Sequence, residues 1–334
     1  MTTLEPPVVS VVTPVYNGAT DLAQCIESVL AQTYPHWEYI IVNNHSTDGT
    51  LEIAERFARM DERIHVYSND ALLDIIANHN RAFGLISPAS TYCKVVSADD
   101  WLFPECLTRM VGLAEAIPSV GIVGSYQLSG GGKTWRDWSV KWGQVPYPSA
   151  VVPGREVGRI HMLGGVDVFG SPTSLMYRAD LVRKQERFYP NTSAEADTSA
   201  CCRCFRETDY GFVHQVLSYE RVHDSRMTTR SQSLNAYLPS DISDLLEYGD
   251  GFLSAVEKQQ RLQGLMAQYY DFLAISVLKR REREFWAYHR QRLAALGSPL
   301  SSVHLGKAVC AALLGLLFNP KQTLETVSRL RQRA

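Results

Sequence analysis

The chain of 334 residues lacks an apolar run long enough to cross a membrane. Its longest apolar run, "AVCAALLGLLF" at 308–318, has eleven residues, whereas a membrane-spanning helix needs about twenty. The first residues, "MTTLEPPVVSVV", lack the basic segment and long apolar stretch of a secretory signal peptide. We therefore expect a protein that works in the cytoplasm and does not span the membrane.

Paired cysteines and an excess of positive charge are also lacking. Seven cysteines, an odd number, are scattered along the chain, which favours reduced thiols in a cytoplasmic protein. Cys201, Cys202 and Cys204 are close together, but their spacing is not that of paired zinc-binding knuckles. The net charge of −2 gives no electrostatic reason to expect a nucleic-acid partner.

The near-neutral total charge hides an uneven distribution. From Lys279 to the C-terminus there are eleven Lys and Arg residues and three Glu residues, a net charge of +8, so the first 278 residues carry −10. The basic tail is either a solvated helical face or a segment that contacts an anionic surface. The run at 308–318 is likewise either a buried core helix or a helix on the membrane surface. Peripheral contact with the inner face of a membrane therefore stays open.

The first 128 residues alternate between apolar strands and amphipathic helices. The expected strands are 8–15, 37–42, 63–67, 92–96 and 120–128. Such alternation is typical of an α/β fold with a mostly parallel sheet flanked by helices. Ligands of such sheets bind beyond the carboxyl ends of the strands, which directs attention to the loops 14–19, 43–48 and 97–101.

The pattern loosens after a probable hairpin turn, "SGGGK" at 129–133, and three tryptophans follow at Trp135, Trp138 and Trp142. From about residue 234 the chain has helical patterns only. We therefore expect a domain at 1–232 with a C-terminal α-helical extension at 233–334. The domain divides into a nucleotide-binding half at about 1–128 and an acceptor half at about 129–232.

Two adjacent carboxylates, Asp99 and Asp100, follow the expected strand at 92–96. Like charges side by side repel each other, and a bound Mg²⁺ or Mn²⁺ would remove that repulsion. The alternative is that Asp100 caps the helix that begins near Pro104. In the other two loops, the amides of Asn43 and Asn44 can donate to and accept from a flat heterocycle. Pro14 and Tyr16 offer an apolar wall for a base, although Tyr16 could equally be a packing residue.

Two segments resemble the family 2 glycosyltransferases of the GT-A fold: "VSVVTPVYNGATDLAQCIESVLAQTYPHWEYIIVNNHSTDGT" (9–50) and "KVVSADDWLFPECL" (94–107). The resemblance covers roughly residues 8–225. It implies a nucleotide-sugar donor, a divalent cation (Mn²⁺ or Mg²⁺), and transfer with inversion at the anomeric carbon. A role in cell-envelope polysaccharide biosynthesis fits such an enzyme. The chain has no QxxRW-like motif, so we expect a non-processive enzyme.

The resemblance also implies roles for individual residues. Asp197 in "AEADTSACCR" matches the general base, with Glu195 as its alternative, and Asp99, Asp100 and His223 are the expected metal ligands. The expected nucleotide-sugar-binding residues are Thr13, Pro14, Tyr16, Asn43, Asn44, Asp48, Asn80, Lys94, Ala98, Asp99, Asp100 and His223. The expected acceptor residues are Trp101, Ser171, Pro172 and Thr173.

Two positions depart from the family pattern. Ser97 replaces the first acid of the DxD motif, and Asn43–Asn44 replace the acid that usually reads the base. Asn can still accept a hydrogen bond from uracil N3–H, so a UDP-sugar is the first choice, with dTDP and GDP open. The acceptor is the hydroxyl of a glycan or a lipid-linked intermediate.

Two other functions are compatible with an α/β fold that binds a nucleotide. A nucleotidyltransferase should carry a Gly-rich basic phosphate loop, but "TPVYNG" has one Gly and no Lys or Arg. A non-catalytic module that binds a nucleotide-sugar or a glycan is the alternative if Ser97 and Ala196 mark a decayed site.

Overall fold

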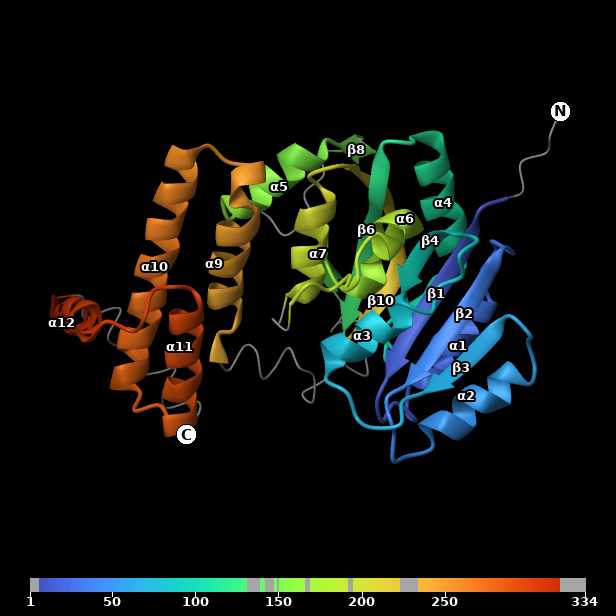
Figure 1. Ribbon diagram of the computed structural model, residues 1–334, viewed down its shortest axis with the longest axis horizontal. Coiled ribbons are helices and arrows are strands. Elements are labelled where there is room, and N and C mark those ends of the chain that lie inside the picture. Colours follow the sequence, from blue (N-terminus) through green and yellow to red (C-terminus); the bar gives the residue numbers. More distant parts are fainter. Residues whose placement is uncertain are drawn as a thin grey trace. The chain divides into compact units, whose positions relative to one another are not determined.

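The computed structural model describes residues 6–130, 139–141, 147, 148, 150–165, 169–191, 195–222 and 234–318. The chain forms two compact units, Met1–Thr229 and Arg230–Ala334, coloured blue to yellow and orange to red in Figure 1. The division of the first unit into a nucleotide half and an acceptor half stays a prediction.

The first unit is built on one mixed sheet with the strand order β3-β2-β1-β4-β9-β6-β10-β5. Parallel pairing joins β1 to β2 and β4, β2 to β3, and β6 to β10, while β9 runs antiparallel between β4 and β6. The expected mostly parallel sheet is confirmed. The strands are β1 (Val8–Val15), β2 (Trp37–Asn43), β3 (Ile64–Ser68), β4 (Ser90–Val95), β5 (Trp101–Leu102), β6 (Val120–Gly130), β7 (Ser139–Lys141), β8 (Val151–Val152), β9 (Leu175–Arg178) and β10 (Asp209–Arg221).

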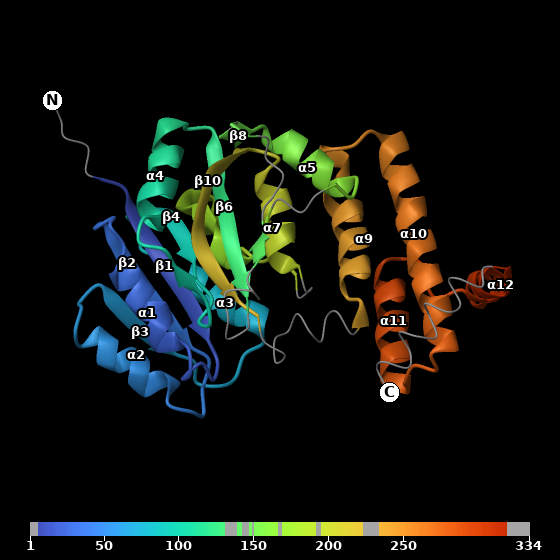
Figure 2. The ribbon, with the colours of Figure 1, turned by 180° about the vertical axis from the view of Figure 1, so that it is seen from behind.

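Helices cover both faces of this sheet (Figures 1 and 2). On one face α1 (Leu22–Leu30), α2 (Thr50–Ala58) and α4 (Cys106–Ala116) share a hydrophobic core with the strands. On the other face lie α3 (Ile75–Phe83), α6 (Ala179–Arg183) and α7 (Ala196–Cys204), which contact β1, β4 and β6 respectively. A short helix, α5 (Gly154–Met162), contacts β10, and the 3₁₀ turn η2 (Pro172–Ser174) precedes β9.

Local sequence explains why these helices form. In α1 the apolar side chains Leu22, Cys25, Ile26 and Val29 recur at helical spacing, and all four are buried. Asp74 occupies the N-cap of α3, where its side chain accepts a hydrogen bond from the backbone N–H of Ala77. One expectation was wrong: residues 210–223 were expected to form two short strands, but 209–221 form the single strand β10, with irregular register against β6.

The second unit is helical, as expected from its sequence. Ser254 and Glu257 form a reciprocal capping box at the start of α10, which fixes where this long helix begins. Its elements are α9 (Tyr237–Tyr248), η3 (Gly249–Gly251), α10 (Ala255–Leu278), α11 (Arg283–Ala295) and α12 (Ser302–Phe318). In the part of the chain that the structure describes, none of the helices combines the length and the hydrophobicity that crossing a membrane requires.

The run at 308–318 lies within α12, and none of the residues of this helix is buried. The expectation of a buried core helix is therefore wrong. The alternative expectation, a helix on the membrane surface, stays a prediction.

Candidate active site

A cleft of about 1000 Å³ opens in the first unit where β1 and β4 end. Five residues expected to bind the donor line it: Pro14, Tyr16, Asn44, Ala98 and Asp99. Ser97, which replaces the first acid of the DxD motif, lines it as well. The carboxyl ends of neighbouring parallel strands meet at one edge of a sheet, so three loops that are distant in sequence converge there. The cleft is also lined by residues outside the three expected loops, among them Leu72, Leu73, Ile75, Asn78, His79 and Arg221.

The loops after β1 and β2 are tied together by short polar bridges. Asn17, in the left-handed region with φ 49°, accepts a hydrogen bond from the Thr47 N–H at 2.8 Å. The Asp48 carboxylate accepts from the backbone N–H groups of Ala19 (3.1 Å) and Thr50 (3.0 Å). Although partial burial opposes it, hydrogen bonding from Thr50 and Ala19 lowers the pKa of Asp48. Asp48 therefore holds the mouth of the cleft together.

Tyr16 stands at this mouth with 48% of its surface exposed. Three more large apolar side chains of the same cleft are also exposed: Leu72, Leu73 and Ile75. An exposed apolar cluster that lines a cleft is characteristic of a ligand-binding wall. The four side chains can hold the flat faces of a base.

Asn44 lies 2% exposed beside this wall, and its amide is already engaged. Its Nδ2 donates to the backbone oxygen of Leu73 at 2.9 Å, and its Oδ1 accepts from the Leu73 N–H at 2.9 Å. Oδ1 also accepts from Asn69 at 2.7 Å, which uses both of its lone pairs. Asn43 is buried as well: its amide donates to the Ser68 hydroxyl (3.2 Å) and accepts from the Ser46 N–H (3.2 Å). The expected acceptance of uracil N3–H by this pair is therefore not supported by the structure.

The two adjacent carboxylates occupy different environments. Asp99 is partly exposed and lines the cleft. Asp100 is 2% exposed; its Oδ2 accepts from the Thr173 hydroxyl at 2.6 Å and its Oδ1 from the Arg221 backbone N–H at 3.0 Å. Asp100 is also not the cap of α4, whose N-cap position is Glu105. These contacts make Asp100 a residue that joins the strand-end loop to η2 and β10.

Three predicted ligand-binding residues are fully buried and form the floor beneath the cleft instead. The Thr13 hydroxyl donates to the Val96 oxygen at 2.7 Å. The Lys94 ammonium donates to the backbone oxygens of Thr173 and Leu175, the latter at 3.0 Å. Burial lowers the pKa of Lys94, and the Asp100 carboxylate opposes that shift. With no exposed surface, Thr13 and Lys94 cannot touch a donor, and Thr173 cannot touch an acceptor.

The other expected acceptor residues keep some exposure. Ser171 and Pro172 are half-buried, and the Ser171 hydroxyl accepts from the Gln127 amide at 2.8 Å. Trp101, also half-buried, stacks on Tyr219 with ring centroids 3.7 Å apart and an interplanar angle of 11°. The three tryptophans at 135, 138 and 142, like His223, lie outside the described residues.

Arg221, at the end of β10, brings a positively charged guanidinium group to the cleft. Its Nε donates to the Asp99 backbone oxygen at 3.1 Å and lies 3.2 Å from Asp21 Oδ1. Its Nη2 donates to Gln24 Oε1 at 2.7 Å. The guanidinium also lies 5.3 Å from the Trp101 ring centroid. Its place two residues before His223 in "YERVH" was the one sequence signal that could have pointed to it.

His79 and the residues that pack behind it form another side of the cleft. His79 lines the cleft and stacks on Tyr189 at 5.4 Å, and burial lowers the pKa of His79. Asn80, an expected donor-binding residue, instead clasps the Tyr189 backbone with two hydrogen bonds of 2.9 Å. Burial raises the pKa of Tyr189, and the Asp197 carboxylate raises it further. Asp197 lies in the first turn of α7.

The expected metal ligands that the structure describes, Asp99 and Asp100, do not form a preformed coordination site. Among the residues that the structure describes, no three His, Cys, Asp or Glu side chains gather closely enough to hold a metal ion. Of the two adjacent carboxylates, Asp99 lines the cleft and Asp100 accepts from Thr173. Mg²⁺ and Mn²⁺ sites in such enzymes commonly use one or two carboxylates, with phosphate oxygens and water as further ligands. Asp99 fits that donor set. The seven cysteines form no disulfide bond, in agreement with the expected reduced thiols.

Residues 10–185, more than half of the chain, match the family model described as Glycosyl transferase family 2. The chain belongs to glycosyl transferase family 2. Its relatives are named glycosyltransferases, and the chain is a glycosyltransferase. It is 29% identical over 225 residues to the glycosyltransferase EpsE of Bacillus subtilis, a match that covers 66% of this chain and 74% of EpsE.

A second relative matches over a shorter stretch. The family 2 chain is 52% identical over 60 residues to the teichuronic acid biosynthesis glycosyltransferase TuaG of Bacillus subtilis. That match covers 18% of this chain and 24% of TuaG, so the chain spans about a quarter of that relative's length.

Solved structures agree with this family fold. TarS 1–349 of S. aureus superposes with a TM-score of 0.60 at 16% identity, over 86% of this chain and 79% of TarS. The mannosyltransferase PcManGT of Pyrobaculum calidifontis, in complex with GDP-Man and Mn²⁺, gives a TM-score of 0.54 at 16% identity, over 97% and 84%. At these identities the likeness shows the GT-A fold alone.

Proposed function

We propose that this family 2 enzyme transfers a sugar from a nucleotide-diphosphate sugar, preferably a UDP-sugar, to a hydroxyl of a glycan or lipid-linked acceptor, with inversion. One observation carries the proposal: the cleft places an aromatic wall at Tyr16 and a carboxylate at Asp99 in one space of about 1000 Å³. A base needs the first, and a diphosphate with its cation needs the second.

The nucleotide is assigned from the neighbours as well as from the cleft. TarS 1–349 has been crystallised with UDP-GlcNAc and with UDP, and PcManGT with GDP-Man. UDP stays first because the apolar wall suits a small pyrimidine. Asn44 lines the cleft, and the second N–H of its Nδ2 can donate to a uracil carbonyl. Recognition then uses an amide donor rather than the acceptor that the sequence suggested.

The divalent cation is held by Asp99, and His223 stays a candidate second ligand. When bound, the cation supplies positive charge beside the diphosphate oxygens, which stabilises the leaving nucleoside diphosphate. Asp100 keeps the Asp99 loop in place through Thr173 and Arg221 rather than binding the ion. Arg221 adds a permanent positive charge on the same side of the cleft.

Proton transfer is assigned to Asp197. The acceptor hydroxyl attacks the anomeric carbon from the face opposite the diphosphate, the bond to the diphosphate oxygen breaks, and Asp197 takes the hydroxyl proton. General bases of this kind contribute roughly 10²–10⁴-fold to the rate. The place of Asp197 in the first turn of α7 matches the acid that the family resemblance assigns as the general base. Glu195, two residues earlier at the N-cap position of α7, is the alternative base.

The partners follow from the chemistry and the relatives. The name of TuaG refers to teichuronic acid biosynthesis, and we extend to this chain a role in cell-envelope polysaccharide assembly. Nucleotide-sugars and reduced thiols both suit the cytoplasm, where we place the enzyme, with peripheral contact at the inner face of the membrane through its C-terminal unit.

The decisive experiment is a thermal-shift screen of UDP, dTDP, GDP and CDP, each with and without Mn²⁺. A ligand that binds only the folded state raises the melting temperature by mass action. We expect the largest shift with UDP and Mn²⁺ together. A UDP shift of the same size without the ion would remove the metal from the proposal. A larger shift with GDP would replace the UDP assignment.

A further inference from the structure

The second unit exposes an apolar helix to solvent. In α12 the exposed fractions are 44% for Leu313, 53% for Leu314, 75% for Leu317 and 82% for Phe318. Most side chains of a folded domain's apolar helix face its core, because exposed apolar surface costs about 25 cal/mol per Å². Four large exposed side chains in six residues therefore mark a surface that something else covers.

The exposed surface surrounds the end of the helix instead of lying along one side. Every residue from Ala308 to Phe318 is apolar or Gly, and only a narrow stripe including Ala308, Ala312 and Leu316 is partly buried. A protein groove covers one face of a helix, and such a helix carries polar residues on its other face. A helix that is apolar all round needs a continuous apolar medium.

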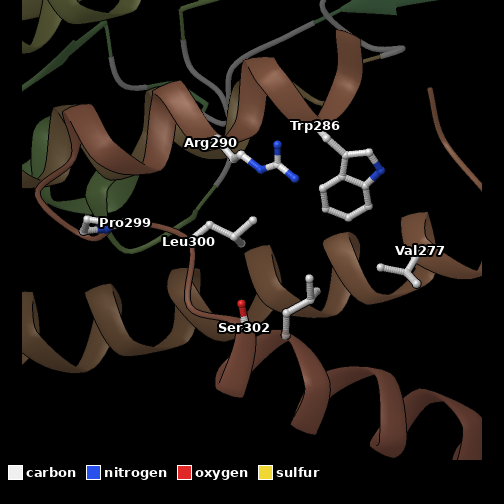
Figure 3. A pocket seen from close by; sticks show the side chains of 7 residues that line it. Val277, Trp286, Arg290, Pro299, Leu300 and Ser302 are labelled. Atoms are coloured by element: carbon white, nitrogen blue, oxygen red, sulfur yellow. The ribbon is translucent and has the colours of Figure 1, made fainter. Parts of the chain in front are cut away.

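A pocket of about 620 Å³ lies at the foot of this helix (Figure 3). Leu305 of α12 and Val277 of α10 supply apolar lining, and Trp286 and Arg290 reach into it from α11. Arg290 is exposed, and no ion pair or hydrogen bond is found for its guanidinium among the described residues. An apolar pocket with one free cation and an indole at its edge matches a phosphate attached to an acyl chain.

The charge of the second unit indicates which kind of partner covers the exposed surface of α12. The turn between α10 and α11 and the first residues of α11 carry Lys279, Arg280, Arg281 and Arg283 against two acids, Glu282 and Glu284, and all six are exposed. The chain from residue 279 onward has a net charge of +8. A second copy of this unit would bring like charges together, whereas an anionic lipid surface attracts each Lys or Arg by about 1 kcal/mol.

We propose that α12 and the pocket at its foot bind the surface of an anionic lipid bilayer, with Arg290 on a lipid phosphate and Trp286 at headgroup depth. Eleven apolar residues span roughly 16 Å as a helix, about half of the hydrocarbon core. Upright insertion would carry Lys321 to the middle of the bilayer. The helix therefore lies in the plane of the interface. This inference rests on the membrane location proposed above and is independent of the transfer chemistry.

The test is co-flotation of the full chain with vesicles of phosphatidylcholine alone or with one-third phosphatidylglycerol. Wild-type protein floats with the anionic vesicles and loses most of that binding at 0.5 M salt, because screening shortens electrostatic attraction. The double variant Leu317→Glu, Phe318→Glu loses binding at least tenfold. Met60→Glu is the matched control, since Met60 is 73% exposed in the first unit, and it floats like wild type.

The pocket is tested separately. Arg290→Gln weakens binding to anionic vesicles by about fivefold, the effect of one charge at the surface, while Arg206→Gln, at an exposed position of the first unit, changes nothing. Equal flotation of the double variant and wild type overturns the proposal. So does a wild-type dimer in sedimentation that the double variant abolishes, because α12 then covers a second copy. Donor hydrolysis by the same preparations shows whether the transfer proposal stands or fails on its own.

Discussion

The side-chain amide of Asn44 makes two hydrogen bonds to the backbone of Leu73. It donates to the Leu73 oxygen and accepts from the Leu73 N–H, at 2.9 Å each. A carboxylate at this position could accept from the N–H but would face the Leu73 oxygen without a proton to donate. This explains why the chain departs from the family's acid here. The amide fixes the segment that presents Leu72 and Leu73 to the cleft, so the departure serves the shape of the donor site.

Asn44→Asp is therefore expected to weaken UDP binding by about tenfold, because an uncompensated buried acceptor costs on the order of 1–3 kcal/mol. Isothermal calorimetry with UDP and Mn²⁺ measures the dissociation constant directly. Asn43→Asp is a comparison variant from the same loop that keeps the two hydrogen bonds between Asn44 and Leu73. Tighter UDP binding by Asn44→Asp would contradict the prediction and would mean that this side chain faces the base.

Asp99 and Asp100 are expected to give different phenotypes despite being neighbours. Asp99→Asn removes the part of UDP-sugar affinity that depends on Mn²⁺ and leaves the melting temperature close to that of wild type. Asp100→Asn lowers the melting temperature, since its carboxylate accepts from Thr173 and Arg221 in a buried place. Calorimetry and thermal unfolding of both variants decide the matter. Mn²⁺-dependent binding retained by Asp99→Asn would discard the metal assignment.

Asp197→Asn is expected to reduce kcat by roughly 10²–10⁴-fold with little change in donor KM, because the proton acceptor is lost and the donor cleft is not. Glu195→Gln is the matched control in the same turn and keeps kcat within a few-fold of wild type. Steady-state transfer to a hydroxyl acceptor gives both constants. Reversed behaviour of the two variants would move the base to Glu195.

The second unit contains a buried titratable pair that makes its stability depend on pH. His289 is fully buried against Tyr269, whose hydroxyl lies 2.8 Å from Nδ1, and burial lowers the pKa of His289 to about 4. In the unfolded chain this pKa is about 6.5. Between these values the unfolded state binds more protons, so the contribution of His289 to stability is lost as the pH falls from 6.5 to 4.

The expected loss reaches at most about 3 kcal/mol below pH 4. Asp241 acts in the opposite sense, because burial raises its pKa to about 6, so the prediction concerns a difference between two proteins. Urea unfolding at pH 7 and pH 4.5 should show a smaller loss of stability in His289→Gln than in wild type. Parallel losses in the two proteins would show that the pKa of His289 is the same in the folded and the unfolded state.

The burial of three expected ligand-binding residues in the first unit has one physical cause. Thr13, Lys94 and Thr173 stand in or beside the expected ligand-binding loops, and polar residues there were read as ligand contacts. Each instead satisfies a buried backbone or side-chain group supplied by a distant segment: Val96, Leu175 and Asp100 respectively. Buried polar groups need partners, and sequence spacing gives no measure of which partner a fold brings near.

By itself, the sequence determined the strand and helix alternation, the family, and the loops that meet at the cleft, because apolar periodicity and strand-end position are local properties. It also determined that the chain after residue 234 is helical. Only the tertiary structure decided that Asp99 faces the cleft while Asp100 is buried, that Arg221 joins them, and that α12 is exposed. Which side of a residue meets solvent depends on segments that are distant in the chain, and the fold alone brings these together.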